Sequence, residues 1–125
     1  MAKTIATILG VVFILVGIVG FFDHTLMGTH LSNTHNAVHL ISGALSLYFG
    51  LAGSLSAARL FCIIFGIVYA LLGVAGLALG SGPDRILPID DLLMLGTMDH
   101  GVHILLGVVF LVGGFLTKPV VTTAD

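Results

Sequence analysis

The amino-acid sequence predicts an all-α membrane protein, a four-helix transmembrane bundle built from two tandem parallel two-helix repeats. Hydrophobic residues make up 58% of the 125 residues and charged residues only 8%, and the mean hydropathy is +1.21. A soluble domain of this size needs more polar surface than such a composition supplies. We therefore expect a single integral membrane domain over residues 1–125.

Four apolar runs define the predicted spans, which cover residues 5–22, 37–55, 60–79 and 101–116. At 1.5 Å per residue these runs are near the length needed to cross about 30 Å of hydrocarbon. The runs are continuous and lack the alternation typical of a membrane β-barrel, so helices are expected. The first run follows Lys3, but it is too long for a signal peptide and no cleavage site follows it, which indicates a retained first helix.

Internal repetition links the first half of the chain to the second. The stretch ILGVVFILVGIVGF at residues 8–21 matches IFGIVYALLGVAGL at 64–77, and NAVHLISG at 36–43 matches HGVHILLG at 100–107. The first repeat covers about residues 5–55 and the second about 60–116. Because each repeat crosses the membrane twice, both enter it from the same side, and we expect a pseudo-two-fold axis along the membrane normal.

Small residues indicate how the helices pack. Each predicted helix carries two glycines seven residues apart, which places both on one face and permits close helix contacts. The pairs are Gly10 and Gly17, Gly43 and Gly50, Gly66 and Gly73, and Gly107 and Gly114. The single cysteine, Cys62, lies inside the third run and is expected to be a buried packing residue.

The few cations predict the orientation. Lys3, Arg59 and Lys118 fall on one side of a four-span protein, whereas Arg85 alone falls on the other. The positive-inside rule then places both termini in the cytoplasm and all six histidines at the outer side.

The outer loop before the fourth span leaves two alternatives open. A short interfacial helical turn over residues 92–95, capped by Asp90 or Asp91, precedes a span that begins near Gly101. Alternatively the fourth span begins near Leu92, which would bury residues 99 and 100 inside the bundle.

Two histidine pairs are the candidate functional residues. His35 and His39 are four residues apart and His100 and His103 three apart, so each pair lies on one helical face. His39 and His103 occupy equivalent positions of the two repeats, which predicts equal depth in the membrane. An ionisable group inside a span is a functional hypothesis by default.

Three interpretations of these histidines stay open. A histidine near the headgroups can simply hydrogen-bond a loop carbonyl or a neighbouring side chain. Imidazole and carboxylate ligands also suit zinc or copper, and the candidate ligands are His35, His39, Asp99, His100 and His103. Finally, His39 and His103 can ligate the iron of haem or the magnesium of chlorophyll from two helices. The remaining histidines, His24 and His30, are expected to be exposed loop residues.

Several function classes are not indicated. The loop serines and aspartates form no recognisable nucleophile arrangement, so we expect no enzyme. The predicted spans contain no central charged residue of the kind a proton relay needs, and no basic patch supports nucleic-acid binding.

The segments HNAVHLISGALSLYFGL, ARLFCIIFGIVYALLGVAGLALG and DHGVHILLGVVFLVGG together resemble a family of small four-helix bacterial membrane proteins of unassigned function. Its HNxVHxxxG element corresponds here to His35, Asn36, Val38, His39 and Gly43, whereas the second repeat has Asp99 and His100 where His35 and Asn36 stand. The resemblance implies a bacterial inner membrane, or an internal membrane derived from it. The leading functional hypothesis is a structural or accessory subunit that packs against lipid and other membrane protein subunits, and the alternative is a cofactor-binding protein.

Overall fold

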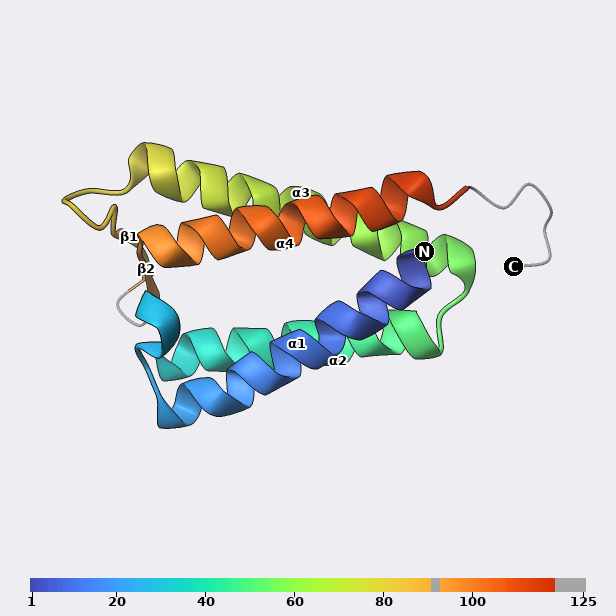
Figure 1. Cartoon of the computed structure of the whole chain (residues 1–125), viewed down its shortest axis with the longest axis horizontal. Helices are drawn as coiled ribbons and strands as arrows, with labels where there is room; N and C mark the ends of the chain where they lie inside the picture. Colours follow the sequence, from blue (N-terminus) through green and yellow to red (C-terminus); the bar gives the residue numbers. More distant parts are fainter. Residues whose placement is uncertain (91–92, 119–125) are drawn as a thin grey trace.

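The computed structural model describes residues 1–90 and 93–118, and these residues form four long helices and a small β-hairpin (Figure 1). The elements in chain order are α1 (Ala2–Phe22), the 3-10 helix η1 (Leu26–Gly28), α2 (Asn33–Leu51), α3 (Leu55–Leu79), β1 (Leu87–Asp90), β2 (Leu93–Leu95) and α4 (Thr97–Leu116). The expectation of an all-helical architecture with four long helices is confirmed.

The four helices pack as two pairs, α1 with α2 and α3 with α4. In Figure 1 the pairs are closest at the N-terminus of α1 and separate toward the opposite end. We call this opposite end, where α1 and α3 end and where α2 and α4 begin, the histidine end, because all six histidines lie in or near it.

Glycines permit the close approach within each pair. A Cβ atom at Gly10 would lie 2.8 Å from Leu47 Cγ, and one at Gly66 would lie 2.6 Å from Leu111 Cγ. Real Cβ atoms essentially never come within 3.0 Å of such neighbours. In both helix pairs, therefore, a leucine side chain packs against a glycine of the partner helix.

Aromatic side chains fill the space between the pairs. The rings of Phe13 and Tyr69 have centroids 5.4 Å apart, and Phe110 lies 6.2 Å from Phe13. All three residues are buried. Aromatic pairs at such separations add to the burial of apolar area, so this cluster joins α1, α3 and α4.

The end opposite the histidines is closed by contacts of the N-terminus. The Ala2 N–H donates to Thr117 Oγ1 at 2.7 Å, and Cys62 Sγ lies 3.5 Å from the Ala2 carbonyl oxygen. Ala2 and Cys62 are fully buried, which agrees with the packing role expected for the cysteine.

Three helices, α1, α3 and α4, are long and apolar enough to cross a membrane. The second helix, α2, has a lower mean hydropathy because its inner face is polar: Ser46 is fully buried and its hydroxyl donates to the Ala6 carbonyl at 2.6 Å. Its outer face is apolar, with Ile41 63% and Leu51 68% exposed. Polar residues inside and apolar residues outside reverse the pattern of a soluble helix, and three membrane-crossing candidates indicate a membrane protein.

The loop before α4 differs from both alternatives drawn from the sequence. The fourth helix begins at Thr97, between the two predicted starts. Residues 93–95 form β2, which pairs antiparallel with β1. The prediction of a helical turn over 92–95 is therefore wrong for residues 93–95, the part of that turn that the structure describes. Asp91 and Leu92 lie outside the described residues. Paired strands satisfy the backbone hydrogen-bonding groups of this loop, which a single helical turn would leave largely open.

Candidate functional site

The histidine cluster begins with the way α2 starts. Ser32 is the N-cap residue, and its Oγ accepts a hydrogen bond from the His35 N–H at 3.2 Å. Capping of this kind stabilises the first turn of a helix. It fixes the helical phase that turns His35 and, one turn later, His39 toward the inside of the bundle.

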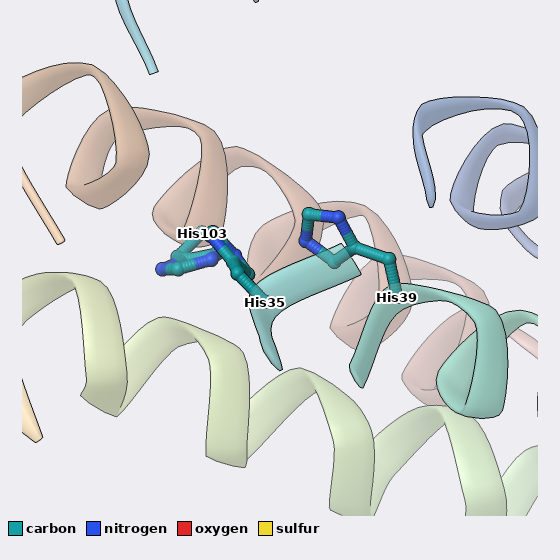
Figure 2. Close-up of side chains that lie close together, drawn as sticks. All are labelled: His35, His39 and His103. Carbon is teal, nitrogen blue, oxygen red and sulfur yellow. The ribbon is translucent and has the colours of Figure 1, made fainter. Parts of the chain in front are cut away.

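Three imidazoles converge from two helices. One ring nitrogen from each of His35, His39 and His103 lies within 4.8 Å of those of the other two. The exposed fractions of these residues are only 3%, 6% and 3%. Figure 2 shows the His39 ring pointing toward the other two rings, and the His35 ring centroid is 4.2 Å from that of His39 and 5.8 Å from that of His103.

Hydrogen bonding leaves nitrogen lone pairs free in this cluster. His35 Nδ1 lies 2.7 Å from the His30 carbonyl oxygen, which can only accept, so Nδ1 carries the hydrogen and Nε2 keeps a lone pair. Among the described residues, buried His39 Nδ1 and His103 Nδ1 have no hydrogen-bond partner. Asn36 Oδ1 and His100 Nδ1, outside the cluster, also lack partners among the described residues, so the convergence of the three rings is what distinguishes this position.

Asp99 lies outside the cluster and holds the loops around it. Its carboxylate accepts hydrogen bonds from the Gly96 N–H at 2.9 Å and from the His30 N–H at 3.0 Å. His30 Nδ1 lies 3.2 Å from the same carboxylate. Asp99 therefore fixes the backbone of residue 30, whose carbonyl orients His35.

His100 also lies outside the cluster. Its Nε2 donates to the Arg85 carbonyl at 2.7 Å, and its ring packs against Gly76. Asn36 makes the matching contacts in α2, where its Nδ2 donates to the Leu31 carbonyl at 3.2 Å and its side chain packs against Gly20. Each residue ties the start of its helix to the preceding loop, so the interpretation of His100 as a loop-carbonyl donor agrees with the structure.

The expectation for the loop histidines holds for one of them only. His24 is exposed, with its Nε2 3.2 Å from Asn33 Oδ1. The His30 side chain is only 35% exposed and lies between two carboxylates, with Nε2 3.4 Å from Asp84 and Nδ1 3.2 Å from Asp99. The sequence carried no signal for this, because the contact depends on the path of two irregular loops.

Two cavities border the three histidines. The larger, of ≈ 220 Å³, is lined by Ser42 and Tyr69, whose hydroxyl oxygens lie 3.0 Å apart, and by apolar side chains of α2 and α3. The smaller, of ≈ 140 Å³, lies toward α1 and η1 and includes Met27 and Met98 in its wall. Neither the hydroxyl pair nor the methionines were singled out from the sequence, where they stand among apolar residues without a motif.

Comparison with known proteins gives a family without an activity. No curated protein matches the chain, and no solved structure matches it. The family model described as a domain of unknown function, DUF4383, matches residues 3–116, which is nearly the whole chain. The expectation of a family of unassigned function is confirmed, and the chain belongs to the DUF4383 family.

Proposed function

We propose that this protein binds one zinc or copper ion through His35, His39 and His103. The observation that carries the proposal is the convergence of three buried ring nitrogens within 4.8 Å of one another. Imidazole is a common ligand of both metals. The proposed role is binding rather than catalysis.

The cluster needs only a small adjustment to hold a metal. Zinc–nitrogen bonds of about 2.0–2.1 Å in a tetrahedral site place the nitrogens about 3.3 Å apart. The ring nitrogens, within 4.8 Å of each other, approach this spacing through rotations of the side chains into the adjoining cavities. Rotation of His39 and His103 breaks no hydrogen bond at Nδ1, which has no partner among the described residues, whereas His35 is held through its Nδ1 by the His30 carbonyl.

A second shell supports the ligand set. Metal-bound histidines usually donate their other ring N–H to a carbonyl or carboxylate, which fixes the tautomer. The His30 carbonyl accepts from His35 in this way at 2.7 Å, and Asp99 holds residue 30 in place through its backbone N–H.

A tetrapyrrole bound between His39 and His103 is supported less well. The imidazole of His35 lies 4.2 Å from that of His39 and 5.8 Å from that of His103, centroid to centroid, so it occupies space beside both proposed axial ligands. The cavities of ≈ 220 and ≈ 140 Å³ are also smaller than the roughly 300–1,000 Å³ typical of larger ligand sites.

The accessory-subunit hypothesis has weaker support than the metal site. The glycine pairs that suggested easy contact with partner helices are used within the chain. A Cβ atom at Gly17 would lie 2.8 Å from Leu40, and one at Gly73 would lie 2.6 Å from the His100 carbonyl oxygen. The exposed apolar faces of the helices suit lipid and partner proteins equally.

The proposed topology has four spans, with both termini cytoplasmic in a bacterial inner membrane or a membrane derived from it. Duplication of a two-helix unit is supported by corresponding contacts, since Leu47 meets Gly10 as Leu111 meets Gly66. Because His39 and His103 are each the seventh residue of their helix, the metal would lie about 9 Å from the helix starts at 1.5 Å per residue.

A metal titration tests the proposal. The full chain is purified in mild detergent, freed of metal with a chelator, and titrated with Zn²⁺ while bound metal is measured by elemental analysis. We expect one equivalent per chain, lost in a His39→Ala/His103→Ala variant and kept in His24→Ala, whose ring is exposed outside the cluster. Circular dichroism checks that helicity is retained.

Two results would contradict the proposal. One is a chain that binds no Zn²⁺ and no copper, or that binds them equally in the double variant. The other is an absorption band of haem or chlorophyll in protein taken from its native membrane, which would favour the tetrapyrrole instead. A colourless, metal-free protein that co-purifies with a larger complex would favour the accessory subunit.

A further inference from the structure

We infer that the metal taken by this site is Cu(I) and that it reaches the histidines through the smaller cavity, guided by the thioethers of Met27 and Met98. The inference rests on the proposed function, because it specifies the metal and its path at the same site. Three observations support it: the placement of the methionines, the absence of charge among the converging ligands, and the continuity of one cavity wall.

Methionine is concentrated at the histidine end. Of the four methionines in the chain, Met27, Met94 and Met98 lie in η1, β2 and the first turn of α4. Their exposed fractions are 79%, 46% and 46%. These three thioethers are therefore accessible at the histidine end, although many other apolar side chains of this protein are exposed as well.

Two of these methionines share a wall with the site. Met27 and Met98 line the ≈ 140 Å³ cavity, which all three cluster histidines also line. Met27 stands at φ 52°, a left-handed conformation that few residues other than glycine adopt. A costly backbone conformation at a solvent-exposed apolar residue is consistent with a functional position. An ion that enters this cavity meets sulfur first and nitrogen afterwards.

Ligand softness selects among the metals that imidazole binds. Thioethers are soft ligands that bind Cu(I), whereas Zn²⁺ prefers thiolate, imidazole and carboxylate. A path lined by methionine therefore favours copper in its reduced state. Met94, which is absent from the cavity wall, has the same exposure as Met98 and serves as a matched comparison.

The charge of the ion supports the same choice. The three converging ligands are neutral imidazoles when they bind metal. The nearest described carboxylate on the cavity wall, Asp99, already accepts hydrogen bonds from the Gly96 and His30 N–H groups. The cost of moving an ion out of water rises with the square of its charge, so the desolvation cost here is smaller for Cu(I) than for Zn²⁺, although three neutral imidazoles hold Zn²⁺ in other proteins.

Transfer kinetics test the inference. The full chain in lipid nanodiscs is mixed with Cu(I) held by bicinchoninate and ascorbate, and transfer is followed by loss of the chelator's absorbance. We expect one Cu(I) per chain, bound more tightly than Zn²⁺ measured with its own chromophoric chelator, because thioethers near the site favour the softer ion. We expect a Met27→Leu/Met98→Leu variant to load several-fold more slowly, because the thioethers that bind Cu(I) before it reaches the histidines are missing. Met94→Leu should load at the wild-type rate, and both variants should still bind one equivalent.

The outcomes separate the inference from the proposed function. If Zn²⁺ binds to the three histidines as tightly as Cu(I), or if the double methionine variant loads as fast as Met94→Leu, the copper inference is wrong while the metal site stands. Equal slowing of Zn²⁺ and Cu(I) loading would also overturn it, because that result indicates a change in shape rather than the loss of sulfur ligands. If neither metal binds, the proposed function itself fails.

Discussion

Replacement of Gly107 by alanine tests the packing that positions the site. Gly107 is buried in α4, and a Cβ atom there would lie 2.5 Å from the backbone N of Ala70, 2.7 Å from its Cβ and 2.8 Å from its Cα. None of these atoms belongs to a flexible side chain, so α3 and α4 must separate by several tenths of an ångström. Overpacking of this kind costs about 1–3 kcal/mol, and a main-chain obstacle belongs to the upper part of that range.

Alanine also favours the helix, and this offsets part of the cost. Glycine to alanine gains about 1 kcal/mol inside a helix, so Gly107→Ala should lower the free energy of unfolding by about 1–2 kcal/mol, a roughly 5–30-fold change in the folded-to-unfolded ratio. Gly101 in the same helix is exposed and a Cβ there would have no atom within 4 Å. Gly101→Ala should therefore stabilise the protein by about 0.5–1 kcal/mol.

Reversible unfolding in mixed micelles of a mild detergent and sodium dodecyl sulfate, followed by circular dichroism, measures both changes. The decisive quantity is the difference between the two variants, because helix propensity is common to both. If Gly107→Ala is as stable as Gly101→Ala, the close approach of α3 and α4 does not exist and the described position of His103, one turn away, loses its support.

Four further substitutions test the positioning of the site and the hydroxyl contact beside it. Asp99→Asn should lower the affinity for metal about 10–100-fold, the effect of losing a supporting group. The Gly96 and His30 N–H groups both donate to Oδ2, and the amide would place an NH₂ group where Oδ1 now accepts from the His30 N–H at 3.2 Å. His100→Asn, equally buried but tied to a loop carbonyl, should leave that affinity unchanged in the same titration, and equal losses in both would show a general effect of burial. Ser42→Ala and Tyr69→Phe each remove the hydroxyl contact of 3.0 Å and should each cost about 1 kcal/mol of unfolding free energy. The double variant should cost clearly less than their sum in a double-mutant cycle, and strict additivity would show that the two hydroxyls do not interact.

The helical parts of the fold could be predicted because their signals are long. Runs of apolar residues and glycines seven residues apart repeat over two or more turns, so errors at single positions do not matter. The start of α4 lacked such a signal, because Met98, Asp99 and His100 show no apolar period. A weak local signal was present: Asp99 stands three residues after Gly96, the spacing at which an acidic side chain accepts from the N-cap backbone N–H.

The candidate site was predictable in its centre and not at its edges. Equivalent positions in the matching stretches predicted equal depth for His39 and His103. Helical spacing paired His35 with His39 and His100 with His103, whereas the structure brings together His35, His39 and His103 and leaves His100 out. The third residue of α2 is His35 and the third of α4 is Asp99, yet only the histidine joins the cluster. Asp99 instead meets the N–H of His30, and the path of that loop depends on tertiary contacts that no local pattern encodes.

The proposed ligands of the site belong to different halves of the chain. His35 and His39 stand on α2, whereas His103 stands on α4, and each helix packs mainly against its own partner, α1 or α3. An ion bound by all three would link the α1–α2 pair to the α3–α4 pair at the histidine end, where the pairs diverge (Figure 1). Binding of the metal and association of the two helix pairs would then be linked. Free metal at 100 times its dissociation constant would stabilise the associated pairs by about 2.7 kcal/mol. Loss of the ion would loosen the histidine end first, while the contacts of buried Ala2 with Thr117 and Cys62 hold the opposite end together.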